Sequence, residues 1–272
     1  MRGALSFILA LLCAVPAAPR PPAVRAEPAR GRVRLNVMSY NIHVGVGMDK
    51  KQDLARIAEV IKRNRVDIVG LQEVDRGVER TGRVDEIKEL ARLTGMDYAF
   101  AHNLDYQGGQ YGVAVLSRFP ILAIDHRRYA NRRERERRGF IRVEIEVGGR
   151  RLNFVTTHLD YQLLDGRVFE TEQLLKALEG VRGPLLVAGD FNEEPPGGAY
   201  DMMLKAGFTD VWRSCASCAQ DPAGGLTYPA DKPTKRIDYV FHRGLGGGEH
   251  ATATVPDTLA SDHRPLFVSL KF

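Results

Sequence analysis

Short apolar runs that each stop at a polar side chain are the feature that most limits how this chain can fold. The runs span residues 35–40, 66–72, 152–157 and 184–188. They lead into Asn41, Glu73, His158 and the pair Asp190/Asn192. Continuous apolar runs of this length are typical of strands buried on both faces, and such strands give a rigid base to the polar groups that follow them.

Two further segments add acid and imidazole groups. Residues 235–241 form a strand-like stretch that carries Asp238 inside it, and Ser261-Asp262-His263-Arg264-Pro265 lies near the end of the chain. An Asp-His pair at the end of a strand supplies a metal ligand next to a candidate base. Phosphate hydrolysis can use acid, amide and imidazole groups that are held at strand ends.

Helical and strand patterns alternate along the chain. Leu54, Ile57, Ala58 and Ile61 recur at helical spacing after Asp53, a candidate N-cap. We expect further helices at residues 85–94 and 168–178, and strands at 68–71, 111–117, 140–147, 152–156 and 185–188. No internal repeat or linker interrupts this alternation, so the 272 residues are expected to form one large α/β domain after the N-terminal segment.

The ordered set Asn41, Glu73, His158, Asp190/Asn192, Asp238 and Asp262/His263 resembles the endonuclease/exonuclease/phosphatase superfamily. That group includes pancreatic deoxyribonuclease, abasic-site endonucleases, neutral sphingomyelinases, deadenylases and inositol-polyphosphate 5-phosphatases. The resemblance runs in order from about Val33 to Phe272. It implies a four-layer sandwich, in which two packed mixed β-sheets are flanked by helices.

The resemblance also implies a role for each residue. Glu73 is expected to be the principal ligand of Mg²⁺, with Mn²⁺ as a substitute, because Mg²⁺ takes few protein carboxylates and keeps several waters. Asn41 and Asp262 are the neighbouring ligands. The expected catalytic residues are His263 as general base, Asp238 as its orienting partner, Asp190 and Asn192 around the water, His158 on the phosphate, and Tyr111 facing the phosphate.

The sequence indicates the type of reaction more narrowly than it indicates the substrate. His158, in place of Asn, departs from the abasic-site endonucleases, and Glu193-Glu194 after Asn192 departs from the inositol 5-phosphatases. We expect a secreted Mg²⁺-dependent hydrolase of a phosphomonoester or phosphodiester, such as a phospholipid headgroup or an inositol phosphate. The alternatives are a secreted nuclease acting on DNA or RNA, and a binding protein that has lost catalysis. We expect a monomer, with a membrane surface as a partner if the ester is a lipid.

The charge of the chain does not by itself indicate nucleic-acid binding, although the pI is about 9.1. Three of the 39 basic residues and none of the 34 acids lie in residues 1–26, which leaves 36 basic against 34 acidic residues. Residues 126–138 hold seven Arg and two Glu. This run could contact a phosphate backbone, but a single aromatic, Tyr129, interrupts it, so a solvated loop is the favoured interpretation.

The N-terminus has the form of an export signal. Residues 1–26 combine a charged start, an apolar run too short for a membrane span, and small residues near Ala26. We therefore expect a signal peptide at 1–26, a spacer at 27–32, a catalytic domain at 33–272, and a secreted or periplasmic mature protein. Cys215 and Cys218 would then form a local disulfide or remain idle thiols.

Overall fold

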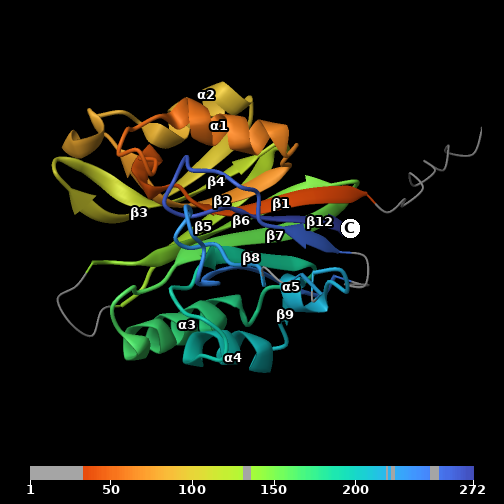
Figure 1. The fold of residues 1–272 in the computed structure, drawn as a ribbon. Helices are drawn as coiled ribbons and strands as arrows, with labels where there is room; N and C mark the ends of the chain where they lie inside the picture. The colour runs from red at the N-terminus through yellow and green to blue at the C-terminus, as the bar shows by residue number, and fades with distance from the viewer. Residues whose placement is uncertain (1–32, 131–135, 219, 222–223, 246–250) are drawn as a thin grey trace, which may run out of the picture. The chain divides into compact units, whose positions relative to one another are not determined.

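The computed structural model describes residues 33–130, 136–218, 220–221, 224–245 and 251–272, and all of them fall in one compact unit (Figure 1). The expected signal peptide and spacer, and Arg132, Arg133 and Arg135 of the arginine-rich run, lie outside the described residues. No helix in the described part of the chain is long and apolar enough to cross a lipid bilayer.

Two six-stranded mixed sheets form the centre of the fold. The first contains, in spatial order, β11 (Thr252–Thr254), β12 (Leu266–Lys271), β1 (Arg34–Asn41), β2 (Ile68–Arg76), β4 (Gly109–Ser117) and β3 (Asp97–Tyr106). The second contains β5 (Ile121–Arg128), β6 (Gly139–Val147), β7 (Arg150–His158), β8 (Leu185–Asp190), β10 (Asp238–Arg243) and β9 (Thr209–Asp210). In each sheet one central pair is parallel, β1 with β2 and β7 with β8.

Helices cover the outer face of each sheet, which confirms the expected four-layer sandwich (Figure 1). Helices α1 (Leu54–Arg63) and α2 (Glu86–Thr94) lie on the first sheet, and α3 (Leu164–Leu178) and α4 (Gly198–Lys205) lie on the second. The remaining helices are short: η1 (His43–Gly45), η2 (Glu79–Thr81) and α5 (Val211–Ser214).

Strand β1 shows how the apolar runs build two cores at once. Leu35 and Val37 pack between the sheets, whereas Met38 and Tyr40 pack toward α1 and α2. All four side chains are fully buried. Successive side chains of a strand point to opposite faces, so a strand with both faces covered needs a continuous apolar run.

The two sheets approach each other closely beside the site. A methyl group on Gly70 of β2 would lie 2.6 Å from Thr156 Oγ1 of β7, so only glycine fits there. Two residues on, Gln72 Nε2 donates a hydrogen bond to the same oxygen at 2.8 Å. This contact fixes the distance between the sheets next to Glu73.

The first two predicted helices are confirmed with their caps. Asp53 accepts hydrogen bonds from the backbone N–H groups of Ala55 and Arg56, and Gly95 ends α2 in the left-handed conformation. The third helix begins at Leu164 rather than Val168. Its first turn follows a turn in which Asp160 accepts from two backbone N–H groups, which the apolar spacing did not indicate.

Two predicted strand positions were wrong. Glu73 does not end a strand: β2 continues to Arg76, and Glu73 lies in a bulge between Leu71 and Val74 with φ of 56°. Asp238 does not lie inside a strand but is the first residue of β10. Cys215 and Cys218 are joined by a disulfide, the first of the two expected states.

Candidate active site

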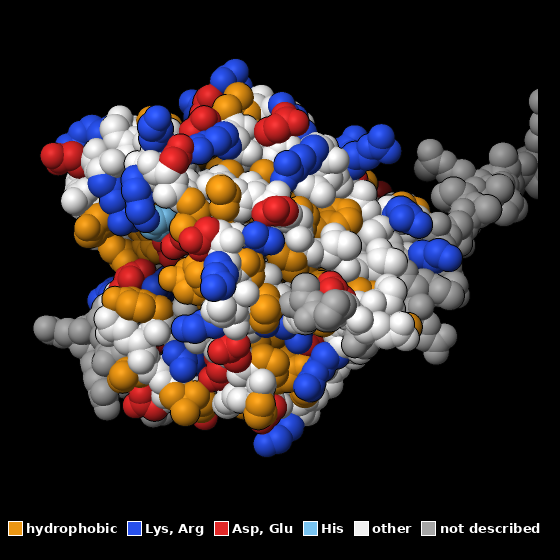
Figure 2. Space-filling view, viewed as in Figure 1, with side chains coloured by type: hydrophobic (Ala, Val, Ile, Leu, Met, Phe, Trp, Pro, Cys, Tyr) orange, Lys and Arg blue, Asp and Glu red, His pale blue; other side chains and the backbone are white. Residues whose placement is uncertain are grey.

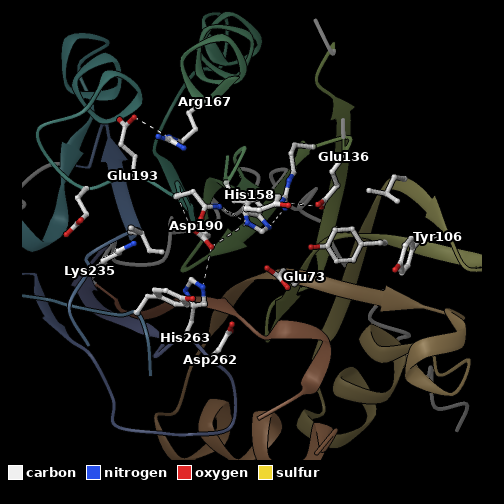
Figure 3. Close-up of a pocket in the computed structure, with 18 of the residues that line it drawn as sticks. Glu73, Tyr106, Glu136, His158, Arg167, Asp190, Glu193, Lys235, Asp262 and His263 are labelled. Atoms are coloured by element: carbon white, nitrogen blue, oxygen red, sulfur yellow. Dashed lines mark hydrogen bonds and ion pairs between the residues drawn. The ribbon is translucent and has the colours of Figure 1, made fainter. Parts of the chain in front are cut away.

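Strand ends from both sheets meet around one pocket of about 950 Å³ (Figure 3). Seven of the nine predicted site residues line it: Glu73, Tyr111, His158, Asp190, Asn192, Asp262 and His263. The other two, Asn41 and Asp238, are buried directly behind these residues and hydrogen-bond to them. The structure thus brings the whole predicted set together.

Register explains why Asp190 lies at the centre of the set. It is the last residue of β8, opposite Asp238 in the antiparallel pairing with β10 and opposite His158 in the parallel pairing with β7. Its Oδ2 lies 3.5 Å from His158 Nε2 and 3.7 Å from His263 Nε2 (Figure 3). His158 therefore approaches this carboxylate from the end of β7, and His263 approaches it from the segment that precedes β12.

Asp190 is itself held firmly. The backbone N–H of Asn192 donates to its Oδ1 at 2.9 Å, and Asn41 Nδ2 donates to its Oδ2 at 3.0 Å. Burial, and then the nearby charge of Asp238, raise the pKa of Asp190 above its usual range. A buried carboxylate with a raised pKa is a group that a positive ion or a protonated imidazole stabilises.

His263 and Asp238 form a buried pair. His263 Nδ1 lies 2.9 Å from Asp238 Oδ2, which also accepts a hydrogen bond from Thr227 Oγ1 at 2.6 Å. Burial alone would lower the pKa of His263, but the carboxylates of Asp238 and Asp190 raise it to about 10. The ring of Tyr228 packs against this imidazole with centroids 4.8 Å apart.

His158 is held neutral by its surroundings. It ends β7, and its ring contacts the guanidinium of Arg138 through Nδ1 and the amide of Asn192 through Nε2 at 3.0 Å. Burial, followed by the positive charge of Arg138 and of His263, lowers the pKa of His158 well below 6.5. A neutral imidazole can donate one hydrogen bond to a phosphate oxygen but cannot supply a positive charge.

Glu73, Asn41 and Asp262 form an oxygen-rich wall, in which Asp262 lies next to His263 (Figure 3). Asn41 Nδ2 donates to Glu73 Oε1 at 3.1 Å, and the Asn41 carbonyl accepts from Ser261 Oγ at 2.8 Å, which brings Asp262 alongside. His43, two residues past Asn41, lies 3.8 Å from Asp262. The bulge in β2 turns the Glu73 side chain into the pocket, where a regular strand would not place it.

This wall fits a hard divalent cation. Glu73, Asp190 and Asp262 all line the pocket, and Asn41 Nδ2 donates to both Glu73 Oε1 and Asp190 Oδ2. Carboxylate oxygens are the ligands that Mg²⁺ prefers. A second group, Asp190, Asp238 and His263, has ligand atoms within 4.8 Å of one another and could also hold a metal ion.

Tyr111 enters the pocket from β4. Its ring is 8% exposed and is covered by the guanidinium of Arg80, which lies 5.4 Å from the ring centroid. Arg80 is fixed in turn by Asp75, a fully buried carboxylate to which it donates two hydrogen bonds of 2.7 and 2.9 Å. The tyrosine is thus part of a rigid wall.

Several pocket residues were not anticipated from the sequence. They are Arg80, Tyr106, Glu136, Arg138, Tyr161, Arg167, Glu193, Tyr228 and Lys235. Arg138 was hidden in the arginine-rich run, which was interpreted as a solvated loop, yet its side chain is 4% exposed. The sequence showed only that Arg138 lies just before the predicted strand 140–147, and the pairing of Gly139 with His158 is known from the structure.

The chain matches one family model and several known proteins. The family model described as "Endonuclease/Exonuclease/phosphatase family" matches residues 38–263. Among curated proteins, the uncharacterized protein YbhP of Escherichia coli K12 is 27% identical over 252 residues, which cover 85% of this chain and 93% of YbhP. A putative neutral sphingomyelinase of Drosophila melanogaster is 25% identical over 256 residues, which cover 83% of this chain and 55% of the fly protein.

Solved structures share the fold. An endonuclease/exonuclease/phosphatase from Beutenbergia cavernae superposes with a TM-score of 0.71 at 24% identity, covering 88% of this chain and 72% of that one. The mannosyl-6-phosphatase Bt3783 of Bacteroides thetaiotaomicron superposes with a TM-score of 0.69 at 20% identity, covering 87% and 99%. These likenesses confirm the arrangement of two packed sheets with helices outside.

Proposed function

This chain belongs to the endonuclease/exonuclease/phosphatase family, and we propose that it acts as a Mg²⁺-dependent phosphoesterase on a small phosphate ester. One observation carries the proposal. The Asp238–His263 pair opens into the same pocket as Glu73 and Asp262, so a base and an oxygen-donor wall face one substrate.

The imidazole of His263 is set up to take a proton from water. When Nδ1–H donates to Asp238, the neutral ring leaves Nε2 as an acceptor on the side of Asp190 and the pocket. Asp238 then stabilises the imidazolium that forms. Asp190 Oδ2 lies 3.7 Å from this Nε2, and Asp190 and Asn192 would orient the attacking water, while His158 would donate a hydrogen bond to the phosphate.

Glu73 and Asp262, with Asn41 between them, are the residues that would hold the cation. Bound there, Mg²⁺ or Mn²⁺ would polarise the phosphoryl oxygens and offset the carboxylate charge that keeps His263 protonated. Without that offset, a pKa of about 10 leaves the base charged near neutral pH. The proposed chemistry therefore needs both the wall and the imidazole pair.

The charges of the pocket favour a small ester over nucleic acid. Three of the four Lys and Arg residues that line it, Arg80, Arg138 and Arg167, each lie within 4 Å of a carboxylate, of Asp75, Glu136 and Glu193 respectively. On the face shown in Figure 2, basic and acidic side chains are interspersed and do not form one basic band. Nucleic-acid binding draws on uncompensated cations, and the fly relative's description supports including a lipid headgroup among the candidates.

A substrate panel tests the proposal. Wild-type protein and His263→Gln would be assayed with Mg²⁺ on bis(p-nitrophenyl) phosphate, inositol phosphates, sphingomyelin, plasmid DNA and RNA. We expect hydrolysis of at least one small ester, and a loss of at least about 10²-fold in the variant. Cleavage of nucleic acid alone would favour the nuclease alternative, and an unchanged rate in the variant would remove His263 from the mechanism.

A further inference from the structure

Two hydrogen-bond donors face the two ring nitrogens of His158. A terminal nitrogen of Arg138 contacts Nδ1, and the amide nitrogen of Asn192 lies 3.0 Å from Nε2. A neutral imidazole has one donor and one acceptor, so it cannot accept from both neighbours unless it loses its only N–H. One of the two contacts must therefore give way.

The hydrogen-bonding groups of Arg138 and Asn192 determine which of the two contacts with His158 is kept. The amide of Asn192 can move off the ring nitrogen and keep its hydrogen bond to the Leu159 carbonyl, to which Nδ2 donates at 3.0 Å, whereas a guanidinium offers five donors and no acceptor and stays protonated in proteins. A proton on His158 Nδ1 would point directly at the Arg138 donor. Nδ1 must accept, and the ring proton is left on Nε2.

Arg138 is well placed for such a role, because it is nearly immobile. Its side chain is only 4% exposed, and its other terminal nitrogen lies 3.2 Å from Glu136. Its carbonyl accepts a hydrogen bond from the backbone N–H of Tyr129 at 2.9 Å, which fixes the chain just before β6. The next residue, Gly139, is paired with His158 itself.

The proton on Nε2 is available to a substrate. Its nearest carboxylate oxygen, Asp190 Oδ2, is 3.5 Å away, longer than an ordinary N–H···O hydrogen bond. His158 lines the same pocket as Glu73 and His263. A phosphate oxygen entering the pocket could accept this hydrogen at normal length.

We propose that Arg138 is a positioning residue that locks His158 in the Nε2–H tautomer, so that Nε2 donates to a phosphate oxygen of the substrate. The catalytic consequence rests on the proposed phosphoesterase function. The tautomer itself does not, because it follows from contacts within the chain.

The tautomer can be measured without any substrate. The ¹⁵N shifts of the His158 ring would be recorded on ¹⁵N-histidine-labelled protein, with the signals assigned through His158→Gln. We expect a protonated Nε2 and an unprotonated Nδ1 in wild type and in Arg138→Lys, whose ammonium also donates and cannot accept. Arg138→Met should release the lock and populate the Nδ1–H form. Arg137→Met, at the exposed neighbouring arginine, is the matched control and should behave as wild type.

Kinetics add a second readout. Arg138→Met should lower kcat by about 10²-fold with KM changed less than about threefold, and Arg138→Lys should recover to within about tenfold of wild type. An unchanged tautomer in folded Arg138→Met would overturn the proposal whatever the activity. So would a rise in KM with kcat kept, which would mean that Arg138 binds the phosphate directly. If Arg138→Met fails to fold, an Nδ1–H signal in wild type or in Arg138→Lys would overturn it. Absence of activity in every protein would count against the proposed function and leave the tautomer result intact.

Discussion

Replacing Asp238 with Asn removes one charge from the pair that prepares His263, with little change in shape. Both donors at this carboxylate, Thr227 Oγ1 and His263 Nδ1, use the same oxygen, Oδ2, and Oδ1 has no hydrogen-bond partner in the described part of the chain. The Asn carbonyl can therefore replace Oδ2 and keep both contacts. Its NH₂ group then takes the place of Oδ1 and is buried without an acceptor.

Two magnitudes follow from this geometry. A buried donor without a partner costs about 1–3 kcal/mol, which for a domain of this size lowers Tm by roughly 2–10 °C. The catalytic loss should be larger, because Asp238 is the first of the charges that raise the pKa of His263 and would stabilise the imidazolium formed during proton transfer. A general base contributes roughly 10²–10⁴-fold to the rate. We therefore expect kcat to fall by this factor, which corresponds to a rise of about 2.7–5.4 kcal/mol in activation free energy.

Steady-state kinetics with Mg²⁺, on the best small ester of the panel, and thermal melts followed by circular dichroism would measure both effects. Thr227→Val is the matched control, because it removes one hydrogen bond from the same oxygen and keeps the charge. We expect it to lose less than about tenfold in kcat while being destabilised by about 1.5–3 kcal/mol. A folded Asp238→Asn within about threefold of wild type, or equal losses in both variants, would refute the assigned role of the Asp238 charge.

Three further predictions concern the metal wall, a buried acid and the N-terminus. Glu73→Gln should lose at least about 10²-fold in rate with an unchanged melt, and a near-normal rate would place the metal elsewhere. Burial and the charge of Asp75 raise the pKa of Glu86 to about 8, above its value in the unfolded chain. Between these two pKa values the folded state holds a proton that the unfolded state releases. The free energy of unfolding should therefore fall by roughly 1–3 kcal/mol between pH 6 and 8.5. Denaturant titrations should show a shallower fall in Glu86→Gln, and equal slopes would contradict this. Mass spectrometry of protein expressed with its full N-terminus in a bacterium should find a mature start near Glu27 outside the cytoplasm, and an intact Met1 on cytoplasmic protein would contradict the export signal.

The sequence predicted part of the site well because Asn41, His158 and Asp190 each end a strand. Strand ends can be recognised from apolar runs, and parallel pairing then places the ends of neighbouring strands at one edge, as it does for His158 and Asp190. The contact between Asn41 and Asp190 joins the two sheets across 149 positions. Only the family resemblance indicated that contact, because local periodicity carries no information on how two sheets meet.

The orientations of the Glu73 and Arg138 side chains could not be predicted from the sequence. Glycine or asparagine usually occupies a bulge position with positive φ and so allows its prediction. The glutamate at position 73 gives no such signal. Arg138 was one of seven arginines in a charged run, and its burial depends on the register of β6 against β7. In both cases tertiary context decides the orientation of a side chain that composition describes only as charged.

The most direct test of the metal-dependent phosphoesterase is turnover with and without a divalent cation. Protein stripped with EDTA should show no hydrolysis of the panel ester, and added Mg²⁺ or Mn²⁺ should restore it in wild type but not in Glu73→Gln at the same concentration. Full turnover in excess EDTA would contradict the account, because Glu73, Asn41 and Asp262 would then have no cation to hold during the reaction.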